Sequence, residues 1–434
     1  MKPSSRWPGF HKQPVAQRRS HVETTFGLEP PADAHPFGVG SLPLAIADQM
    51  IENAIGTLSL PLGLGLNLRV NDVDYVVPMA IEEPSVVAAV SFAARLAREG
   101  GGFRASADPS VMIAQVQVIN YGDAQRAKER VLAAKAELCA LADTFHPQLV
   151  ARGGGARDVE VRVLPAPEGP QGEALFVVHV LVDTRDAMGA NLVNTVAEGL
   201  AQRIEELTGG EVCLRILSNL ADRRLARSEC RIPLEALADF GWPGRRIAEG
   251  VVQASRFAEA DPYRAATHNK GVMNGIDAVA IATGQDWRAI EAGAHAHACR
   301  SGRYGPLSTW RLEGEELAGR IQLPLAVGTV GGPIKVHPGV QAALRILGVK
   351  GAPELAMVLA SVGLAQNLAA VRALGSVGIQ KGHMAMHARS VALTAGARPD
   401  EALRVAELLA ECGDFKVERA REIIAALRGD PKAA

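Results

Sequence analysis

The sequence predicts a mixed α/β (α+β) protein with more than one domain. Its 434 residues exceed one ordinary hydrophobic core, because domains usually hold about 100–150 residues. Between residues 112 and 219, segments with the apolar patterns of strands alternate with amphipathic helical segments. Long Ala-rich helical segments lie on both sides of this region. Since 48% of the residues are hydrophobic and only 4% are aromatic, Ala, Val, Leu and Ile must build the cores.

The middle of the chain predicts a complete small domain over residues 110–219. The segment "VMIAQVQVIN" is the first expected strand, and "DAQRAKERVLAAKAELCALADTF" is an amphipathic helix that begins at an Asp. Two further strands, "ARDVEVRVLP" and "ALFVVHVLVDT", are joined by turn residues. A helix that ends in glycines, "AMGANLVNTVAEGLAQRIEELTGG", precedes the last strand, "EVCLRILSN". This β-α-β-β-α-β order is that of a ferredoxin-like domain.

The flanking segments predict a large domain and a C-terminal helical unit. Residues 1–109 and 220–374 mix helical stretches with Gly- and Pro-rich turns and are expected to form one large mixed domain. Residues 375–434 contain two or three amphipathic helical segments, which are expected to form a separate terminal unit.

Composition excludes several classes of protein. A formal net charge of −1 leaves no broad basic field for nucleic acid. The five cysteines are scattered and form no C-x-x-C pair, so neither a disulfide framework nor a zinc knuckle is expected. The N-terminal segment lacks the apolar core of a signal peptide, and no apolar run approaches the length of a membrane span. We therefore expect a cytoplasmic protein.

The segment from Asp261 to Ala298 places Lys270, Asp277 and Asp286 among glycines, alanines and small apolar residues. Sparse, embedded charges are typical of a pocket wall rather than of an exposed helix face. A lysine neutralised by a buried carboxylate would explain the pattern structurally. The same residues in a cleft are suited to stabilise a developing oxyanion.

Two Gly-rich segments are candidate ligand-binding loops. In "VDTRDAMGANLVNTVAEG", Asp186 and Gly189 stand where a strand ends and a helix begins, which suits a diphosphate. Asp186 as the N-cap of that helix is the alternative. The second loop, "AVGTVGGPIKVHPG", would accommodate a ligand, although a tight turn explains it equally well. No G-x-G-x-x-G fingerprint stands at a β-α junction, so a Rossmann domain is not supported.

Isolated acids and histidines give weaker signals. Glu82 and Glu83 precede Pro84 at the start of an apolar helical segment, where acids ordinarily complement the helix dipole. His383 and His387 have the spacing of two zinc ligands, but the glutamate of H-E-x-x-H and a third ligand are missing. No metal site is therefore expected. His383 is interpreted as a titratable acid with a functional role. His387 is interpreted as a packed structural residue.

Taken together, these segments resemble the 3-hydroxy-3-methylglutaryl-coenzyme A (HMG-CoA) reductases, specifically the soluble bacterial class II form. The similarity spans nearly the whole chain. The segments that carry it are "ENAIG" (52–56), "EEPSVVAA" (82–89), "RDAMGANLVNT" (185–195), "RILSNLADRRLAR" (215–227), "DPYRAATHNKGVMNGID" (261–277), "ATGQDWRAIEAGAHA" (282–296), "GTVGG" (328–332) and "GHMAMHAR" (382–389).

The resemblance implies a four-electron oxidoreductase that interconverts mevalonate plus coenzyme A with HMG-CoA. It implies that Lys270 meets the oxyanion, that His383 protonates the coenzyme A thiolate, and that Glu83 is the neutral acid for the aldehyde step. Asp286 would bridge Lys270 and Glu83. The implied substrate contacts are Ser85, Arg264 and Asn274. The implied cofactor contacts, centred on the small domain, are Asp186, Met188, Gly189, Asn191, Asn219, Gly328, Gly331 and Gly332.

The resemblance also implies a nicotinamide cofactor, a homodimer with the active site at its interface, and a higher oligomer such as a hexamer. NAD is expected from similarity to the degradative form, in which an acid precedes the "GGG" loop. Here His146 or Pro147 falls near that position, Asp143 lies upstream, and Arg152 would tolerate the 2′-phosphate of NADP. The alternatives are an NADPH-dependent biosynthetic reductase and a catalytically silent protein that binds coenzyme A or a nucleotide. The C-terminal helical unit would be a flap that carries His383.

Overall fold

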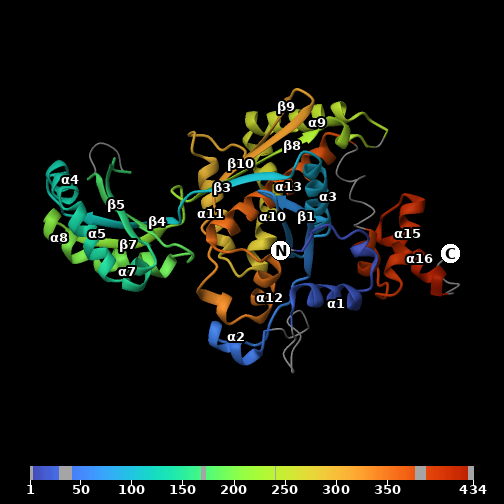
Figure 1. Cartoon of the computed structure of the whole chain (residues 1–434), viewed down its shortest axis with the longest axis horizontal. Coiled ribbons are helices and arrows are strands. Elements are labelled where there is room, and N and C mark those ends of the chain that lie inside the picture. Colours follow the sequence, from blue (N-terminus) through green and yellow to red (C-terminus); the bar gives the residue numbers. More distant parts are fainter. Residues whose placement is uncertain (1–2, 29–41, 168–172, 240, 377–387, 429–434) are drawn as a thin grey trace.

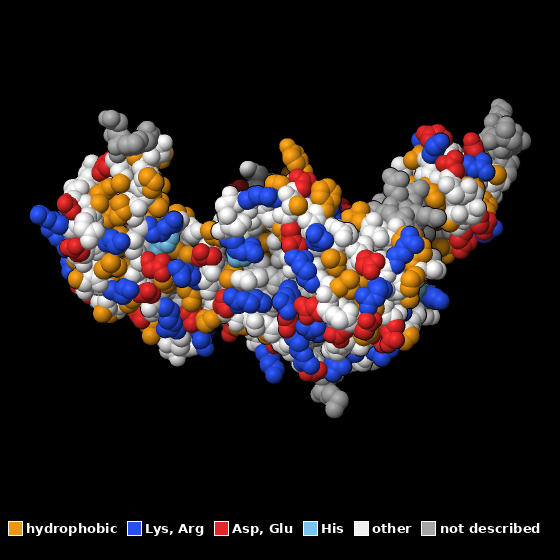
Figure 2. Space-filling model, turned by 90° about the horizontal axis from the view of Figure 1, so that it is seen from above, with side chains coloured by type: hydrophobic (Ala, Val, Ile, Leu, Met, Phe, Trp, Pro, Cys, Tyr) orange, Lys and Arg blue, Asp and Glu red, His pale blue; other side chains and the backbone are white. Residues whose placement is uncertain are grey.

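The computed structural model describes residues 3–28, 42–167, 173–239, 241–376 and 388–428 (Figure 1). Two separate β-sheets carry helices on one face each, which confirms the predicted mixed α/β class. The smaller sheet with its helices lies at one end of the molecule, the larger unit is central, and the C-terminal helices lie at the opposite end (Figure 1). Figure 2 shows basic and acidic side chains interspersed over the face that it views, as the near-zero net charge implies.

The large unit is built on a six-stranded sheet of order β2-β1-β3-β8-β10-β9. β1 runs parallel to β3, and the other neighbouring strands are antiparallel. The strands come from distant parts of the chain: β1 (Leu62–Val70), β2 (Val73–Ala80), β3 (Phe103–Ala107), β8 (Leu225–Pro233), β9 (Ser308–Glu313) and β10 (Glu316–Pro324).

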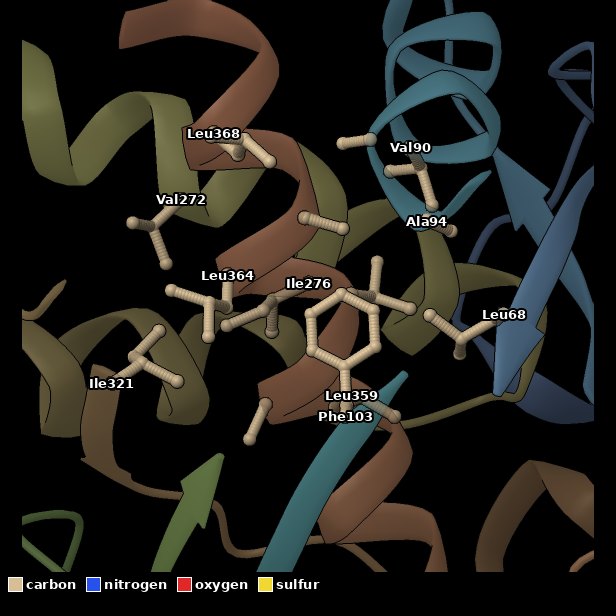
Figure 3. Packing of buried hydrophobic residues seen from close by; sticks show 14 of the residues in the cluster. Leu68, Val90, Ala94, Phe103, Val272, Ile276, Ile321, Leu359, Leu364 and Leu368 are labelled. Carbon is tan, nitrogen blue, oxygen red and sulfur yellow. The ribbon is translucent and has the colours of Figure 1, made fainter. Parts of the chain in front are cut away.

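Helix α13 (Ala352–Leu374) is the central element of the large core. Among the described residues it is the one helix long and apolar enough to cross a membrane, but most of its surface is buried inside the protein. Figure 3 shows Leu359, Leu364 and Leu368 of α13 packed among side chains of the sheet and of helix α10 (Pro262–Ala282). A Cβ at Gly363 would lie 2.8 Å from Cδ1 of Ile276, so glycine permits the close approach of α13 and α10.

The large unit contains further helices. They are α1 (Val15–Phe26), α2 (Leu44–Met50), α3 (Val86–Glu99), α9 (Gly244–Ala260), α11 (Trp287–Ala298) and α12 (Pro338–Leu347). Helices α3, α9 and α10 contribute buried apolar residues to the same core as the sheet, which is why the segments before and after the small sheet fold as one body.

The small unit has the predicted strand–helix–strand–strand–helix–strand order. Its strands β4 (Val111–Ile119), β5 (Gly155–Leu164), β6 (Leu175–Asp183) and β7 (Glu211–Ser218) form an antiparallel sheet of order β5-β6-β4-β7. The first expected helix is interrupted near Ala134 and forms α4 (Ala124–Ala133) and α5 (Lys135–Thr144), and the short helix α6 (Pro147–Ala151) follows it. The second is interrupted near Leu200 and forms α7 (Ala190–Gly199) and α8 (Ala201–Thr208). Their apolar faces bury Leu138, Phe176 and Ile204.

The small unit is inserted between two paired strands of the large sheet. It follows β3 and precedes β8, and these strands are antiparallel neighbours in which Ala107 pairs with Ala226. Both connections to the small unit therefore leave the large sheet at one place.

The C-terminal helices form a core of their own. α15 (Ala402–Cys412) and α16 (Val417–Arg428) bury Val405, Leu409 and Ile424 together with Ala388 from the preceding helical residues 388–394. The predicted residues His383 and His387 lie outside the described residues.

Candidate active site

Helix α10 carries the predicted lysine and two predicted substrate residues. The helix begins at Asp261, whose carboxylate accepts hydrogen bonds from the backbone N–H groups of Tyr263 and Arg264, with Pro262 at the first helical position. Lys270 and Asn274 are four residues apart and so share one face. Nζ of Lys270 lies 2.7 Å from Oε2 of Glu83, and Nδ2 of Asn274 donates to the same oxygen at 3.2 Å. Lys270, Asn274 and Glu83, all predicted site residues, therefore lie in contact.

The partner residues come from the turn between β2 and α3. Ser85 precedes α3 and has a φ of 79°. Residues other than glycine rarely adopt this left-handed backbone conformation, and it often marks functional sites. Its Oγ atom is buried and has no hydrogen-bond partner among the described residues. The Lys270 side chain is 61% exposed and that of Glu83 41% exposed. An ion pair this open adds little stability, but it is accessible to a ligand.

Arg264 lies at the beginning of α10, about 9 Å along the helix axis before Lys270. Burial lowers the pKa of its guanidinium, because the charged form is poorly hydrated there. No acidic partner of Arg264 is present within the described part of the chain. A ligand carboxylate would supply the missing countercharge.

Asp286 is not brought to this cluster within one chain. It is the N-cap of α11: its Oδ1 accepts a hydrogen bond from the N–H of Ala289 at 3.0 Å and lies 3.6 Å from the Arg288 guanidinium. Lys270 stands about 18 Å along α10 from Ala282, where that helix ends. No contact joins Asp286 to Lys270 or Glu83 among the described residues, so the expected bridge stays a prediction.

The two Gly-rich segments meet, as a single ligand-binding surface requires. Ala187 and Val330 form a parallel β-bridge, and the N–H of Thr329 donates to the carbonyl of Asp186 at 2.8 Å. A Cβ at Gly328 would lie 2.4 Å from the backbone nitrogen of Met188, so only glycine fits there.

Asp186 does not cap the helix that follows it. Gly189 holds that N-cap position of α7 with φ of 105°, and Oδ1 of Asp186 accepts from the N–H of Ala352 at 2.9 Å. The N-cap interpretation of Asp186 is therefore wrong, because its carboxylate instead satisfies the first turn of α13. The other predicted cofactor residues, Asn191, Asn219, Gly331 and Gly332, lie exposed around this junction and stay predictions.

Two residues that hold this junction were missed from the sequence. Gln285 is buried and donates to the carbonyl of Gly328 at 2.9 Å, while the N–H of Gly328 donates to its Oε1 at 2.8 Å. Arg224 is also buried and donates to the carbonyls of Ala187, Met188 and Val327. Burial lowers the pKa of Arg224 to about 10. Both residues lie in segments that carry the family resemblance, which was the available signal.

A cavity of about 490 Å³ opens beside Asp186 and Val330. Its small-unit wall includes His146, Arg152 and Arg185. Nε2 of His146 is 3.0 Å from the carbonyl of Leu192, and Oδ1 of Asp143 accepts from the N–H of Ala156 at 2.7 Å. Asp143, the acid upstream of the "GGG" loop, is thus already engaged by a backbone N–H group. Among the described residues, no group of three or more His, Cys, Asp or Glu side chains is placed to hold a metal ion.

Comparison with known proteins decides the family. The family model described as hydroxymethylglutaryl-coenzyme A reductase matches residues 14–388. The chain belongs to this family. Within it, the HMG-CoA reductase of Archaeoglobus fulgidus is 48% identical over 426 residues, which cover 98% of this chain and 95% of the relative. A probable HMG-CoA reductase of Borreliella burgdorferi is 36% identical over 342 residues, 79% of this chain and 77% of the relative.

The fold matches solved HMG-CoA reductases. A structure of the enzyme from Streptococcus pneumoniae aligns with a TM-score of 0.80 and 43% identity, covering 97% of this chain and 100% of the other. A second structure from that organism, described as a class II reductase bound to NADPH in open conformations, aligns with a TM-score of 0.79, 44% identity and coverage of 86% and 100%. The predicted family and the predicted oxidoreductase class are therefore confirmed.

Proposed function

We propose that the chain interconverts HMG-CoA with mevalonate and coenzyme A, using two hydride transfers with a nicotinamide cofactor. The cluster of Lys270, Glu83 and Asn274 carries this proposal, because it places a cation, an acid and an amide at an accessible surface. In the reductive direction each turnover consumes two reduced cofactors and two protons. The residues must therefore stabilise an oxyanion and deliver protons.

Lys270 would act in the first hydride transfer. Hydride addition to the thioester carbonyl creates a negatively charged oxygen, and the ammonium of Lys270 donates hydrogen bonds to it. Collapse of this intermediate breaks the carbon–sulfur bond and expels the coenzyme A thiolate. Free thiols have a pKa of about 8.5, so an imidazolium is a suitable proton donor. His383, outside the described residues, is proposed for that step.

Glu83 would supply a proton in the second hydride transfer. Reduction of the aldehyde intermediate produces an alkoxide, which a neutral carboxylic acid can protonate. The 2.7 Å contact between Glu83 and Lys270 allows a proton to pass between the two groups. Ser85, Arg264 and Asn274 are proposed to hold the hydroxymethylglutaryl part, with Arg264 facing its free carboxylate.

We assign the bridging role of Asp286 to a homodimer in which each chain supplies its Asp286 to the other chain's lysine. The exposed apolar residues around "ENAIG" support an interface there: Ile51 is 59% exposed, Leu58 is 95% exposed and Ile55 is fully exposed. Contiguous exposed apolar side chains typically mark protein interfaces. A higher oligomer, such as a hexamer of these dimers, remains part of the proposal.

The cofactor is proposed from two observations that favour different dinucleotides. Overall resemblance to the degradative form favours NAD(H) and mevalonate breakdown. The cavity beside Asp186 favours NADP(H) as the second candidate, because Arg152 lines it while Asp143 is engaged by the backbone. A guanidinium is well suited to a 2′-phosphate, whereas NAD-specific sites usually present a free acid to the ribose.

Initial rates test the proposal directly. Purified protein is mixed with mevalonate and coenzyme A, and the absorbance of the reduced nicotinamide is followed with NAD⁺ and with NADP⁺. A rate with either cofactor supports the reductase, and the preferred one identifies the dinucleotide. No rate with either, in both directions, would leave a silent protein that binds coenzyme A or a nucleotide.

A further inference from the structure

Five polar side chains form one continuous chain of contacts between α10 and the residues after α11. The carboxyl groups of Asp277 and Glu291 are hydrogen-bonded to each other. Oε2 of Glu291 lies 2.6 Å from Nε2 of His295, and Nδ1 of His295 lies 2.7 Å from the hydroxyl of Tyr304. Nδ2 of Asn269 donates to that hydroxyl at 3.0 Å. The chain thus begins and ends on α10.

Its two ends flank the catalytic segment of α10. Asn269 directly precedes Lys270, and Asp277 comes three residues after Asn274, so the anchors are about 12 Å apart along the helix. Asn269 is buried and fixed further, because it donates to the carbonyl of Gly305 at 2.9 Å and accepts from the N–H of Leu307 at 2.8 Å. The segment that contacts Glu83 is therefore held from both sides.

The contact between the carboxyl groups of Asp277 and Glu291 requires one shared proton. Two adjacent carboxylates repel each other when both are ionised. Burial, together with Glu291, raises the pKa of Asp277 to about 8, whereas His295 lowers the pKa of Glu291. At neutral pH the Asp277 carboxyl thus keeps its proton and donates it to Glu291, which also pairs with His295.

Burial and Glu291 act on Asp277 in the same direction, because each raises its pKa. On α11 the charged groups nearby are Glu291 and, behind it, His295, whose pKa Glu291 raises. Helix α13 packs on α10 with Val362 and Gln366 at Gly275, two residues before Asp277. Oδ1 of Asp277 is buried without a hydrogen-bond partner among the described residues. Loss of the shared proton would place two carboxylates together, with His295 as the cationic partner of Glu291.

We propose that the chain Asp277–Glu291–His295–Tyr304–Asn269 is a positioning network that keeps the Lys270 segment of α10 in its catalytic place. This inference rests on the proposed function, because it requires Lys270 to act on the substrate. The five side chains act through α10 and do not contact the reacting atoms.

The variant Asp277→Asn tests the network. Its amide still donates to Glu291 but has no proton to lose at alkaline pH. For the wild type, kcat in HMG-CoA reduction should fall about tenfold between pH 7 and pH 9, as expected for one ionisation near pH 8. In Asp277→Asn the part of the fall that is centred near pH 8 should disappear, whereas a purely structural contact would leave the shape of the profile unchanged. An unaltered alkaline fall in the folded variant overturns the proposal.

Two further variants keep the test decisive. Tyr304→Phe cuts the network at its other end and should lower kcat at every pH while retaining the alkaline fall. If Asp277→Asn does not fold, Glu291→Gln removes the second carboxylate, and the pH midpoint of the fall must then shift; an unchanged midpoint contradicts the network. A wild type without HMG-CoA reduction refutes the proposed function, whereas an active wild type with unaltered variant profiles refutes only the network.

Discussion

Nζ of Lys270 lies 2.7 Å from Oε2 of Glu83, although 187 positions of sequence separate the two residues. Asn274, one helical turn after Lys270, donates to the same carboxylate oxygen. The contact joins α10 to the turn before α3, so both elements must pack correctly on the sheet before the pair exists. The pair is therefore a product of the whole large core.

Glu83→Gln should lower kcat by about 10²–10⁴-fold, because the amide cannot deliver a proton to the alkoxide. The neighbouring Glu82 is exposed and makes no described side-chain hydrogen bond, so Glu82→Gln is the matched control. Steady-state rates with HMG-CoA measure both variants. Equal effects of the two substitutions would remove Glu83 from the proton-donor role.

Lys270→Ala and Asp286→Ala should each abolish turnover while the protein stays folded, yet mixtures of the two should regain activity. If the two residues of one site come from different chains, half of the randomly mixed dimers carry one intact site out of two. About a quarter of wild-type activity is then expected after subunit exchange. Mixtures that remain inactive would place Lys270 and Asp286 in the same chain's site.

Arg152→Ala should raise the KM for NADP(H) about tenfold and leave the KM for NAD(H) nearly unchanged. One charge-assisted hydrogen bond to a phosphate contributes about 1.5 kcal/mol, which corresponds to that factor. Arg130, exposed on α4, serves as the control substitution to Ala. An equal rise in the KM for both cofactors would show that Arg152 does not bind the 2′-phosphate.

Gln285→Ala should lower the free energy of unfolding by about 2–3 kcal/mol, because it leaves the buried N–H and carbonyl of Gly328 without partners. Gln341→Ala is the control, since Gln341 also donates to a backbone carbonyl but on an exposed surface. Urea unfolding followed by circular dichroism gives both values. A loss no larger than that of the control would contradict a holding role for Gln285.

His268 should make the protein less stable in mild acid. It is 1% exposed, and burial lowers its pKa to about 4 from the usual 6.5, so the unfolded chain binds more protons between those two pH values. Stability therefore rises with pH over this window, and the contribution of His268 is about 2 kcal/mol smaller at pH 5 than at pH 7. Unfolding of wild type and His268→Gln at both pH values measures it; identical pH slopes would exclude His268 as the cause.

Local sequence patterns predicted the small unit well but could not predict the large sheet. Each strand of the small unit alternates or is wholly apolar and lies beside its own helix, so short-range periodicity suffices. In the large sheet, β3 pairs with β8 across more than a hundred residues, and only tertiary packing determines that pairing.

Local patterns likewise predicted only part of the candidate site. Lys270, Asp277 and Asp286 stood out as charges embedded in an apolar segment, but local patterns could not predict that Lys270 contacts Glu83 while Asp286 caps α11. The alternative interpretation of Asp186 as an N-cap is wrong because its carboxylate accepts from Ala352, which is 166 residues away. Gln285 and Arg224 carry no pattern of their own, since their roles depend on carbonyls brought together by folding.

The small unit stands where the turn of a hairpin would connect the paired strands β3 and β8. Because Ala107 and Ala226 are direct partners, the whole ferredoxin-like body occupies a position that a two-residue loop could occupy in a shorter protein. A gene in which a two-residue loop replaces residues 108–225 would therefore encode a continuous hairpin rather than a broken sheet. An exchange of the small unit as a module would still have to preserve the contacts of Asp186 with Ala352 and of Ala187 with Val330.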